Sequence, residues 1–285
     1  MNISLFLDRI KTAVQKRTGS GQGKPGKSYD GWLARGYRNE PTVSIIMQSH
    51  NKSLQILHVV EKLRQRTDIE IIVIDDGSDM EHTKRLAEAL SHGYEFLVRA
   101  NDLYENVTYD RTIRMANGRY VALLQDDDDF DSLDWIDRAI SLFEAHPQMA
   151  ILGGKDGLHI AFEEDTKYAH GGAQYTLPAE GFCFVTAVNR APMWLNRSLF
   201  LEHLKHIDFS FAPFQFDDYE LCARAWLCNL QVGWYDAAFH SLSVGGMRLW
   251  NNAFTKEQSA RNGARLYEMY HDRAAEIQDK IDQLN

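Results

Sequence analysis

The residues with the clearest chemistry are four consecutive carboxylates at positions 126–129, followed by Phe130. The segment 121–124, which only Gln125 separates from them, is apolar and has the length of a buried strand. Open α/β sheets bind their ligands where the parallel strands end. Carboxylate oxygens at such a point suit Mg²⁺ or Mn²⁺, which are often shared with substrate phosphates. We therefore predict a divalent-metal site here; the alternative for an acidic run is a solvated loop.

A second group of carboxylates, Asp217, Asp218 and Glu220, opens an amphipathic segment over residues 217–229. Acidic side chains are favoured in the first turn of a helix, so helix capping is one interpretation. The other is catalytic, because the hydroxyl group of an acceptor is a poor nucleophile and a positioned carboxylate can accept its proton. The residues alone leave both interpretations open.

Composition indicates an ordinary globular α/β protein. The chain has 285 residues, of which 44% are hydrophobic and 25% charged, enough for one larger domain with an added lobe. No apolar stretch approaches the roughly 20 residues of a membrane span, and no secretory signal is visible. The three cysteines lack metal-site spacing and are typical of reduced thiols, so we expect a cytoplasmic protein.

Charge is unevenly distributed along the chain. The net charge is −9, yet residues 1–40 carry eight Lys and Arg against three acidic residues. The acidic remainder argues against nucleic acid as the main partner, because a phosphate backbone requires a basic face. A nucleotide held through a metal ion remains compatible with this charge.

The N-terminal residues 1–28 form a separate segment. Residues 3–17 have apolar side chains at helical spacing with cations opposite, and residues 19–26 read as a glycine-rich linker. This helix either docks on the body or a neighbouring subunit, or lies on an anionic membrane, which would place the protein at its inner face. We expect Tyr29 and Trp32 to pack the following segment against the body.

From Thr42 the pattern alternates between strands and helices. Apolar strands separated by helices predict a mostly parallel sheet covered on both faces. The first helix is expected to turn Leu54, Leu57, Leu63 and either Val60 or His58 inward. Neither a Gly-x-Gly-x-x-Gly motif nor a Walker loop follows the first strand, which argues against a dinucleotide-binding Rossmann domain or a P-loop ATPase. The predicted elements are strands 43–47, 69–74, 95–99 and 119–124 and helices 54–66, 81–91 and 104–117.

The second half of the chain is less regular. Residues 153–178 are rich in glycine, histidine and charge and are expected to form short strands or a mobile loop. The other predicted elements are strands 149–152, 181–188 and 232–239 and helices 133–145, 197–206, 217–229 and 255–284.

The ordered motifs resemble the family 2 glycosyltransferases of the GT-A fold. The resemblance rests on the segment 43–51, on 72–78 with its Asp-Asp-Gly-Ser end, on 124–130, and on 216–226, which is similar to a Glu-Asp-x-Asp-Leu-x-x-Arg helix. His240 with the following Gly245-Gly246 is similar to the histidine that closes the site. Residues 29–41 resemble the lead-in of bacterial surface-polysaccharide transferases.

This resemblance implies a metal-dependent, inverting enzyme that moves a sugar from a nucleotide-diphosphate donor to a hydroxyl of a glycan or lipid-linked acceptor. It would act in polysaccharide or glycoconjugate biosynthesis. The implied fold is a Rossmann-like, mostly parallel sheet with a smaller mixed lobe on the acceptor side. The implied divisions are a GT-A domain at 29–254, with a nucleotide-binding half at 42–130 and an acceptor half at 131–254, and a C-terminal helix at 255–285.

The resemblance also implies roles for single residues. Asp76 would meet the nucleobase with Asp75 beside it, and Asp126 would lie near the ribose and the metal. Asp128 would be the main ligand of Mn²⁺ or Mg²⁺, with His240 as a further metal or diphosphate contact. A divalent metal can offset the charge that grows on the leaving diphosphate. A lone histidine, however, is more often structural.

Asp218 would be the catalytic base. One carboxylate group would then serve the metal and another the proton, and displacement in a single step with such a base inverts the anomeric carbon.

Two departures from the family pattern affect the donor site. Gln48-Ser49-His50-Asn51 stands where the family has Pro-x-Tyr-Asn, so His50 would stack on the base. Tyr109-Asp110 replaces the usual Arg-Asn, so Arg111 or Arg114 would supply the missing charge. The residues predicted to contact the nucleotide are Gln48, His50, Asn51, Asp75, Asp76, Arg111, Asp126 and Asp127.

Acceptor recognition is expected from residues 153–216, with Asp217, Trp194 and Arg190 as contacts. An apolar platform for a sugar ring is one interpretation of five aromatic residues, and a plain core is the other. These residues are Trp194, Phe209, Phe211, Phe214 and Phe216.

Two other functions fit the sequence less well. A nucleotidyltransferase generally needs a basic, glycine-rich phosphate loop near the first strand, where this chain offers only Lys52. A non-catalytic GT-A-like binding module is disfavoured because both Asp128 and Asp218 are present.

Overall fold

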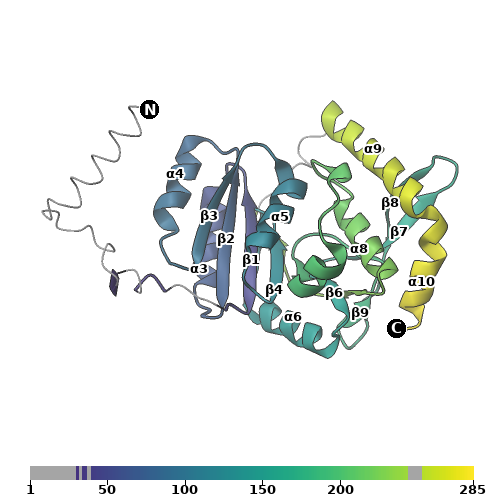
Figure 1. Cartoon of the computed structure of the whole chain (residues 1–285), viewed down its shortest axis with the longest axis horizontal. Helices are drawn as coiled ribbons and strands as arrows, with labels where there is room; N and C mark the ends of the chain where they lie inside the picture. The colour runs from purple at the N-terminus through teal and green to yellow at the C-terminus, as the bar shows by residue number, and fades with distance from the viewer. Residues whose placement is uncertain (1–29, 32–33, 37–39, 243–251) are drawn as a thin grey trace, which may run out of the picture. The chain divides into compact units, whose positions relative to one another are not determined.

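The computed structural model describes residues 30–31, 34–36, 40–242 and 252–285 (Figure 1). The helix and linker predicted over 1–28, Tyr29, Trp32 and the Gly245-Gly246 pair lie outside these residues. The chain divides into two compact units, Met1–Tyr37 and Arg38–Asn285, and the account below concerns the second. Among the helices so described, none is long and apolar enough to cross a bilayer.

An eight-stranded sheet forms the centre of the second unit. The first four strands in its order run parallel, as predicted, and β12 is also parallel to β6. β11 is antiparallel to both β4 and β6, and β9 is antiparallel to β12. The strands, in spatial order, are β3 (Glu95–Ala100), β2 (Ile69–Asp76), β1 (Val43–Ser49), β4 (Tyr120–Leu124), β11 (Met193–Asn196), β6 (Met149–Gly153), β12 (Gln231–Tyr235) and β9 (Phe182–Phe184).

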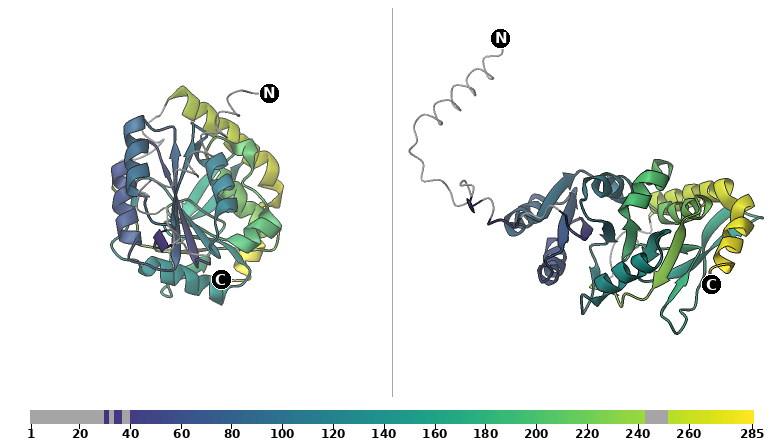
Figure 2. Two further views of the ribbon diagram at one scale, coloured as in Figure 1. Left: turned by 60° about the vertical axis from the view of Figure 1, so that its left-hand side comes forward. Right: turned by 60° about the horizontal axis from the view of Figure 1, so that its bottom comes forward.

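Helices cover both faces of this sheet, which confirms the predicted layering (Figures 1 and 2). One core cluster contains apolar side chains of α3, α4 and α6, and the other contains those of α5, α8, α9 and α10. Their bounds are α3 (Ser53–Leu63), α4 (Met80–Ala89), α5 (Tyr104–Met115), α6 (Asp134–Ala145), α8 (Asp217–Leu227), α9 (Ala253–Tyr270) and α10 (Ala274–Asp282).

The predicted inward face of the first helix was partly wrong. α3 buries Ile56, Val59, Val60 and Leu63, whereas Leu54 is 67% exposed. The apolar residues of this segment fit two stripes, and the observed one has the i, i+3, i+4, i+7 spacing of a helix face that packs on a sheet.

The second half differs from the prediction in its connections. Residues 153–178 form a hairpin of β7 (Gly157–Glu163) and β8 (Tyr168–Gln174), which pairs with β10 (Ala187–Val188) in a separate sheet. The single strand predicted over 181–188 is therefore two strands, β9 and β10, in different sheets.

Two predicted helices are interrupted. The helix predicted over 197–206 is a short α7 (Arg197–Leu199) followed by a π-helical turn, η1 (Phe200–Leu204). The long C-terminal helix breaks at the 3₁₀ turn η4 (His271–Arg273), which lets α9 follow β8 before the chain turns into α10. A further 3₁₀ turn, η2 (Phe209–Phe211), lies before α8.

A buried polar junction fixes β4, the strand that carries the acidic run. Glu70 on β2 is buried and accepts hydrogen bonds from the hydroxyl of Ser44 and from the backbone and side chain of Asn117. The amide of Gly118 donates in turn to Ser44 Oγ at 2.8 Å. The turn before β4 is thus tied to β1 and β2, and it sets where β4 ends.

We predict that Gly118→Ala destabilises the protein. An added Cβ would lie 2.4 Å from the backbone nitrogen of Ser44, so the junction must shift. Such overpacking typically costs about 1–3 kcal/mol of unfolding free energy, measurable by urea titration. Gly172→Ala on β8 is the control, because its nearest neighbours are 3.2 Å away and it should cost less. Equal losses in the two variants would contradict the proposed junction.

Candidate active site

The candidate site lies at the carboxyl ends of the parallel strands. Ser49 at the end of β1 is in register with Asp75 on β2, and Met47 is in register with Leu124, the last residue of β4. The polar residues after these three strands therefore meet at one edge of the sheet, where open α/β folds bind ligands.

Asp76 is the centre of the predicted nucleotide contacts. Its buried carboxylate accepts the backbone amides of Leu103 and Tyr104 at 2.9 and 2.7 Å. These amides open α5, where an anion is stabilised. Gln48 Nε2 donates to the same carboxylate at 3.0 Å, and His50 Nδ1 lies 2.7 Å from the Asp76 carbonyl oxygen. The structure thus brings together three of the predicted residues.

Asp75 and Asn51 lie close by in supporting positions. Asp75 is fully buried and accepts the Thr83 hydroxyl at 2.6 Å, so its carboxylate faces α4. The side chain of Asn51 accepts the amide of Asp79 at 2.8 Å, and its own amide donates to Ser78. Asn51 therefore joins the loops that follow β1 and β2.

The acidic run contains two carboxylates suited to a cation. Asp128 is 3% exposed, and burial raises its pKa to about 7, with further contributions from Asp127 and Asp126. Burial also raises the pKa of Asp126, although Lys52 Nζ lies 2.8 Å from it. A buried carboxylate whose charge is this unfavourable fits a bound divalent ion, which would neutralise it.

Asp129 has a different, structural environment. Lys62 Nζ lies 2.6 Å and His58 Nε2 3.2 Å from its carboxylate. Burial acts to raise the pKa of Asp129, but the hydrogen bonds led by that from Lys62 outweigh it and hold the pKa below its ordinary value. Asp129 thus anchors the acidic run to α3, a role that no motif indicated.

His240 does not join the predicted metal ligands. It lies on β13 (His240–Ser241), which pairs with β5 (Asp128–Asp129), and its Nε2 is 3.4 Å from Asp129. Within the described ranges no three His, Cys, Asp or Glu side chains are placed to hold a metal ion together. The three predicted ligands Asp126, Asp128 and His240 thus do not form such a cluster in this structure, and the histidine contacts Asp129.

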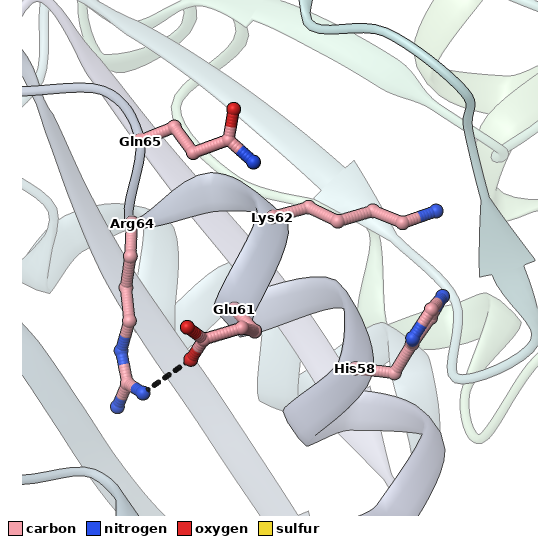
Figure 3. Close-up of a pocket in the computed structure, with 5 residues that line it drawn as sticks. All are labelled: His58, Glu61, Lys62, Arg64 and Gln65. Atoms are coloured by element: carbon pink, nitrogen blue, oxygen red, sulfur yellow. Dashed lines mark hydrogen bonds and ion pairs between the residues drawn. The ribbon is translucent and has the colours of Figure 1, made fainter.

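An open hollow of about 480 Å³ lies on the outer side of α3 (Figure 3). Its cations are largely engaged: His58 and Lys62 contact Asp129, and Arg64 pairs with Glu61 and Glu95. The hollow is lined by His58, Glu61, Lys62, Arg64 and Gln65. It borders the anchor of the acidic run rather than the carboxylates suited to a metal.

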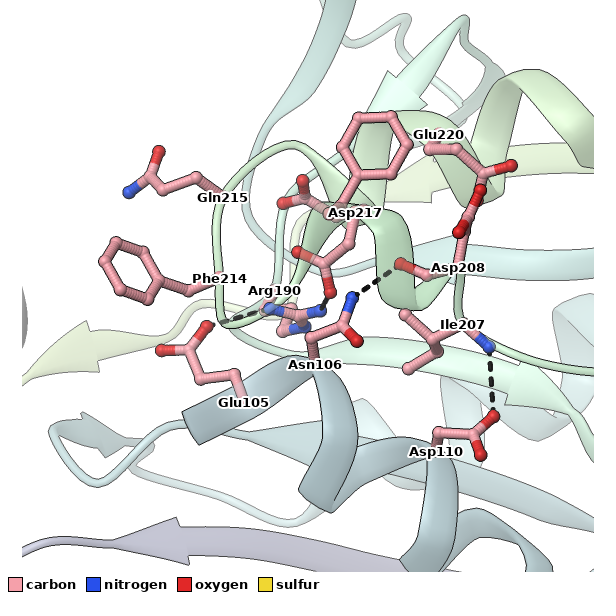
Figure 4. A network of polar contacts seen from close by, with 12 residues as sticks. Glu105, Asn106, Asp110, Arg190, Ile207, Asp208, Phe214, Gln215, Asp217 and Glu220 are labelled. Carbon is pink, nitrogen blue, oxygen red and sulfur yellow. Dashed lines mark hydrogen bonds and ion pairs between the residues drawn. The ribbon is translucent and has the colours of Figure 1, made fainter. Parts of the chain in front are cut away.

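The second carboxylate group lies at the start of α8 (Figure 4). Asp217 is fully buried and bound by Arg190, whereas Asp218 is partly exposed. Burial raises the pKa of Asp218 to about 6; Arg190 opposes this rise and Asp217 adds to it. A partly exposed carboxylate with a pKa just below neutrality has the properties of a general base.

The three residues predicted to contact the acceptor are all buried in this structure. Trp194 is fully buried on β11, where it packs against Trp135, and its Nε1 donates to Tyr235. Arg190 and Asp217 are buried against each other, so neither presents its charge to a ligand. Of the five aromatic residues considered as a platform, Phe211, Phe214 and Phe216 are also buried and only Phe209 is exposed. The plain-core interpretation therefore holds for all but Phe209.

The two arginines expected to supply the missing charge point elsewhere. Arg111 is exposed, with its guanidinium 5.4 Å from the centre of the Phe209 ring. Arg114 is bound to Asp110 and to the carbonyl oxygen of Lys205. Neither contacts the carboxylates at the strand ends.

Glu105 is a site residue that the sequence analysis missed. It lies in the first turn of α5, and its Oε2 is 2.8 Å from Arg190. Burial raises its pKa to about 7, and Arg190 opposes the rise. In the sequence Glu105 has the appearance of an ordinary first-turn carboxylate, and nothing there indicates its partner 85 positions away.

Comparison with solved structures supports the architecture at low identity. GalNAc-T7 solved with UDP, GalNAc and Mn²⁺ matches 70% of this chain with a TM-score of 0.59 and 15% identity. The mannosyltransferase PcManGT from Pyrobaculum calidifontis, with GDP-Man and Mn²⁺, matches 74% with a TM-score of 0.52 and 14% identity. TarS 1–349 from S. aureus, with UDP-GlcNAc, matches 74% with a TM-score of 0.54 and 15% identity.

These matches cover 43% of the GalNAc-T7 chain, 60% of PcManGT and 61% of TarS 1–349, so this chain spans only part of each. A search of curated proteins by sequence found no match. The sequence model described as Glycosyl transferase family 2 matches residues 44–179, which include β1 to β4, the acidic run and the β7–β8 hairpin. This segment is similar to glycosyl transferase family 2, and the fold of the chain is that of the solved glycosyltransferase structures above.

Proposed function

We propose that the protein is a metal-dependent, inverting glycosyltransferase that moves a sugar from a nucleotide-diphosphate donor to a hydroxyl group. The observation that carries this proposal is the separation of two carboxylate environments. Asp128 is buried and Asp126 half-buried after the end of β4, while the partly exposed Asp218 lies at the start of α8. The first environment suits the binding of a cation, and the second suits the acceptance of a proton.

The donor would bind at the ends of β1 and β2. Gln48, His50 and Asp76 already contact one another there, and their polar groups suit a nucleobase and ribose. Asp126 and Asp128 would hold Mn²⁺ or Mg²⁺, which when bound supplies the positive charge that stabilises the leaving diphosphate. The presence of Mn²⁺ with UDP in GalNAc-T7 and with GDP-Man in PcManGT supports this arrangement.

Asp218 would accept the proton of the acceptor hydroxyl as its oxygen bonds to the anomeric carbon. The bond from that carbon to the diphosphate oxygen breaks in the same step, and the diphosphate takes the bonding electrons. A single displacement inverts the anomeric centre. Asp218 remains within reach of solvent because Asp217, not Asp218, makes the buried ion pair with Arg190.

The acceptor is proposed to be a glycan or lipid-linked sugar used in polysaccharide or glycoconjugate biosynthesis. TarS 1–349 from S. aureus, solved with UDP-GlcNAc, supports a nucleotide-sugar donor for such a reaction. Peripheral membrane contact through the N-terminal segment belongs to the same proposal, because residues 1–40 carry eight Lys and Arg against three acidic residues.

We predict metal-dependent nucleotide binding that requires Asp128. Calorimetric titration with UDP, GDP and other nucleoside diphosphates should give binding of one nucleotide with Mn²⁺ and much weaker binding without it. Asp128→Asn should weaken the metal-dependent affinity by more than about tenfold, since even indirect partners of a metal contribute 10–100-fold. Asp131→Asn, an exposed carboxylate nearby, is the matched control. The absence of binding to any nucleotide would refute the donor site.

We also predict that Asp218→Asn lowers kcat by about 10²–10⁴-fold while the dissociation constant of the donor stays unchanged. The wild-type kcat/KM should fall about tenfold per pH unit below pH 6, because a protonated Asp218 cannot accept a proton. Above pH 6 the carboxylate is ionised, so kcat/KM should no longer rise with pH on account of Asp218. Steady-state rates across pH 4.5–8 would measure both effects, and an unchanged kcat in the variant would exclude Asp218 as the base.

A further inference from the structure

Arg190 connects two parts of the site that are far apart in the sequence. It lies between β10 and β11, and its side chain is only 6% exposed. One terminal nitrogen lies 2.8 Å from Glu105 Oε2 and the other binds Asp217 Oδ2. The guanidinium also lies over the ring of Tyr109, 5.2 Å from its centre. Figure 4 shows this side chain between the start of α5 and the start of α8.

The two ends of this bridge lead directly to the reacting groups. Glu105 follows Tyr104, whose backbone amide holds the carboxylate of Asp76 in the donor site. Asp217 precedes Asp218, the proposed base, on α8. The bridge therefore joins the strand-end donor site to the helix that carries the base through one guanidinium.

Arg190 is the cation of a cluster that is otherwise acidic. The charged groups facing it are Glu105 on α5 and Asp217 and Asp218 on α8, with the polar ring of Tyr109 beneath it. Removing one member of a buried ion pair leaves an uncompensated charge, which is strongly destabilising. The cluster thus depends on the guanidinium for its charge balance.

We propose that Arg190 is a positioning residue that spans the donor and base sites and keeps the carboxyl group of Asp218 ionised. The proposal rests on the function proposed above for Asp218. In this proposal Arg190 binds carboxylates of the protein itself, whereas the sequence analysis expected it to contact the acceptor.

The electrostatic balance at Asp218 has a definite sign. Burial is the largest cause raising the pKa of Asp218, Arg190 is the largest cause lowering it, and Asp217 raises it further. Loss of the positive charge therefore moves this pKa upward, so the carboxylate becomes protonated nearer to neutral pH. Loss of the Asp217 charge moves it downward. Opposite charges in contact typically shift a carboxyl pKa by about 1–3 units.

The test measures the ionisation of Asp218 itself. The full-length protein is labelled with ¹³C at aspartate carboxyl groups, and Asp218→Asn identifies its NMR signal. The signal is titrated in wild type, Arg190→Met and Arg190→Lys. We expect Arg190→Met to raise the pKa of Asp218 by about one unit or more. Arg190→Lys, which keeps the charge but loses the planar fork, should stay closer to wild type.

Arg190→Met leaves Asp217 buried without a partner, so a second pair of variants guards against misfolding. Arg190→Met combined with Asp217→Asn removes both charges of the ion pair and keeps the cluster balanced. The pKa of Asp218 in this double variant should exceed that in Asp217→Asn alone, because the two differ only at Arg190. Equal values in these two proteins, or in wild type and Arg190→Met, would overturn the proposal.

Activity provides a second, separate readout. In variants that turn over donor, the acid limb of kcat/KM should move in the same direction as the Asp218 titration. If substitution of Arg190 shifts the titration of Asp218 but the wild-type protein transfers no sugar, the proposed function is refuted and the electrostatic role of Arg190 stands. A lower kcat with an unmoved titration would mean that Arg190 has only a packing role.

Discussion

Like-charged carboxylates gathered at one edge of a sheet are the constraint on which this structure depends. Each is handled by a different local partner: Lys52 for Asp126, Lys62 with two histidines for Asp129, and Arg190 for Asp217. Asp128 forms no ion pair with any described residue, and burial raises its pKa to about 7. Asp128 thus differs from the carboxylates whose charge is balanced by a cation of the protein itself.

Burial of these carboxylates opposes their ionisation, and the cations beside them offset that effect. Burial disfavours the charged form of a carboxylate, and the lysines and the arginine oppose this effect on the carboxylates that they contact. Because those cations come from α3, the loop after β1 and the β10–β11 connection, the ionisation pattern depends on tertiary structure rather than on the acidic motif itself. The consecutive aspartates of the acidic run therefore differ in their environments.

The sequence predicted the parallel half of the sheet well, because near-continuous apolar strands such as Val43–Ser49 alternate with clear helices. It failed for β11, which has only four residues and is too short to show a strand period, and for the chain between Gly181 and Val188, which changes sheets. At the site, Asp76 and the acidic run follow strands and could be located. The partners of Glu105 and Arg190 could not, because an ion pair across 85 positions leaves no local pattern.

β11 has a consequence for how substrates enter. It lies between β4 and β6 and forms backbone ladders with both, so the donor-side and acceptor-side strands belong to one continuous sheet. Hinge closure of one half over the other, as in two-domain transferring enzymes, would have to break those ladders. The spacing between β4 and β6 is consequently fixed by main-chain geometry. Substrate entry and release must then use movements of loops and side chains at the rim, while the sheet itself stays rigid.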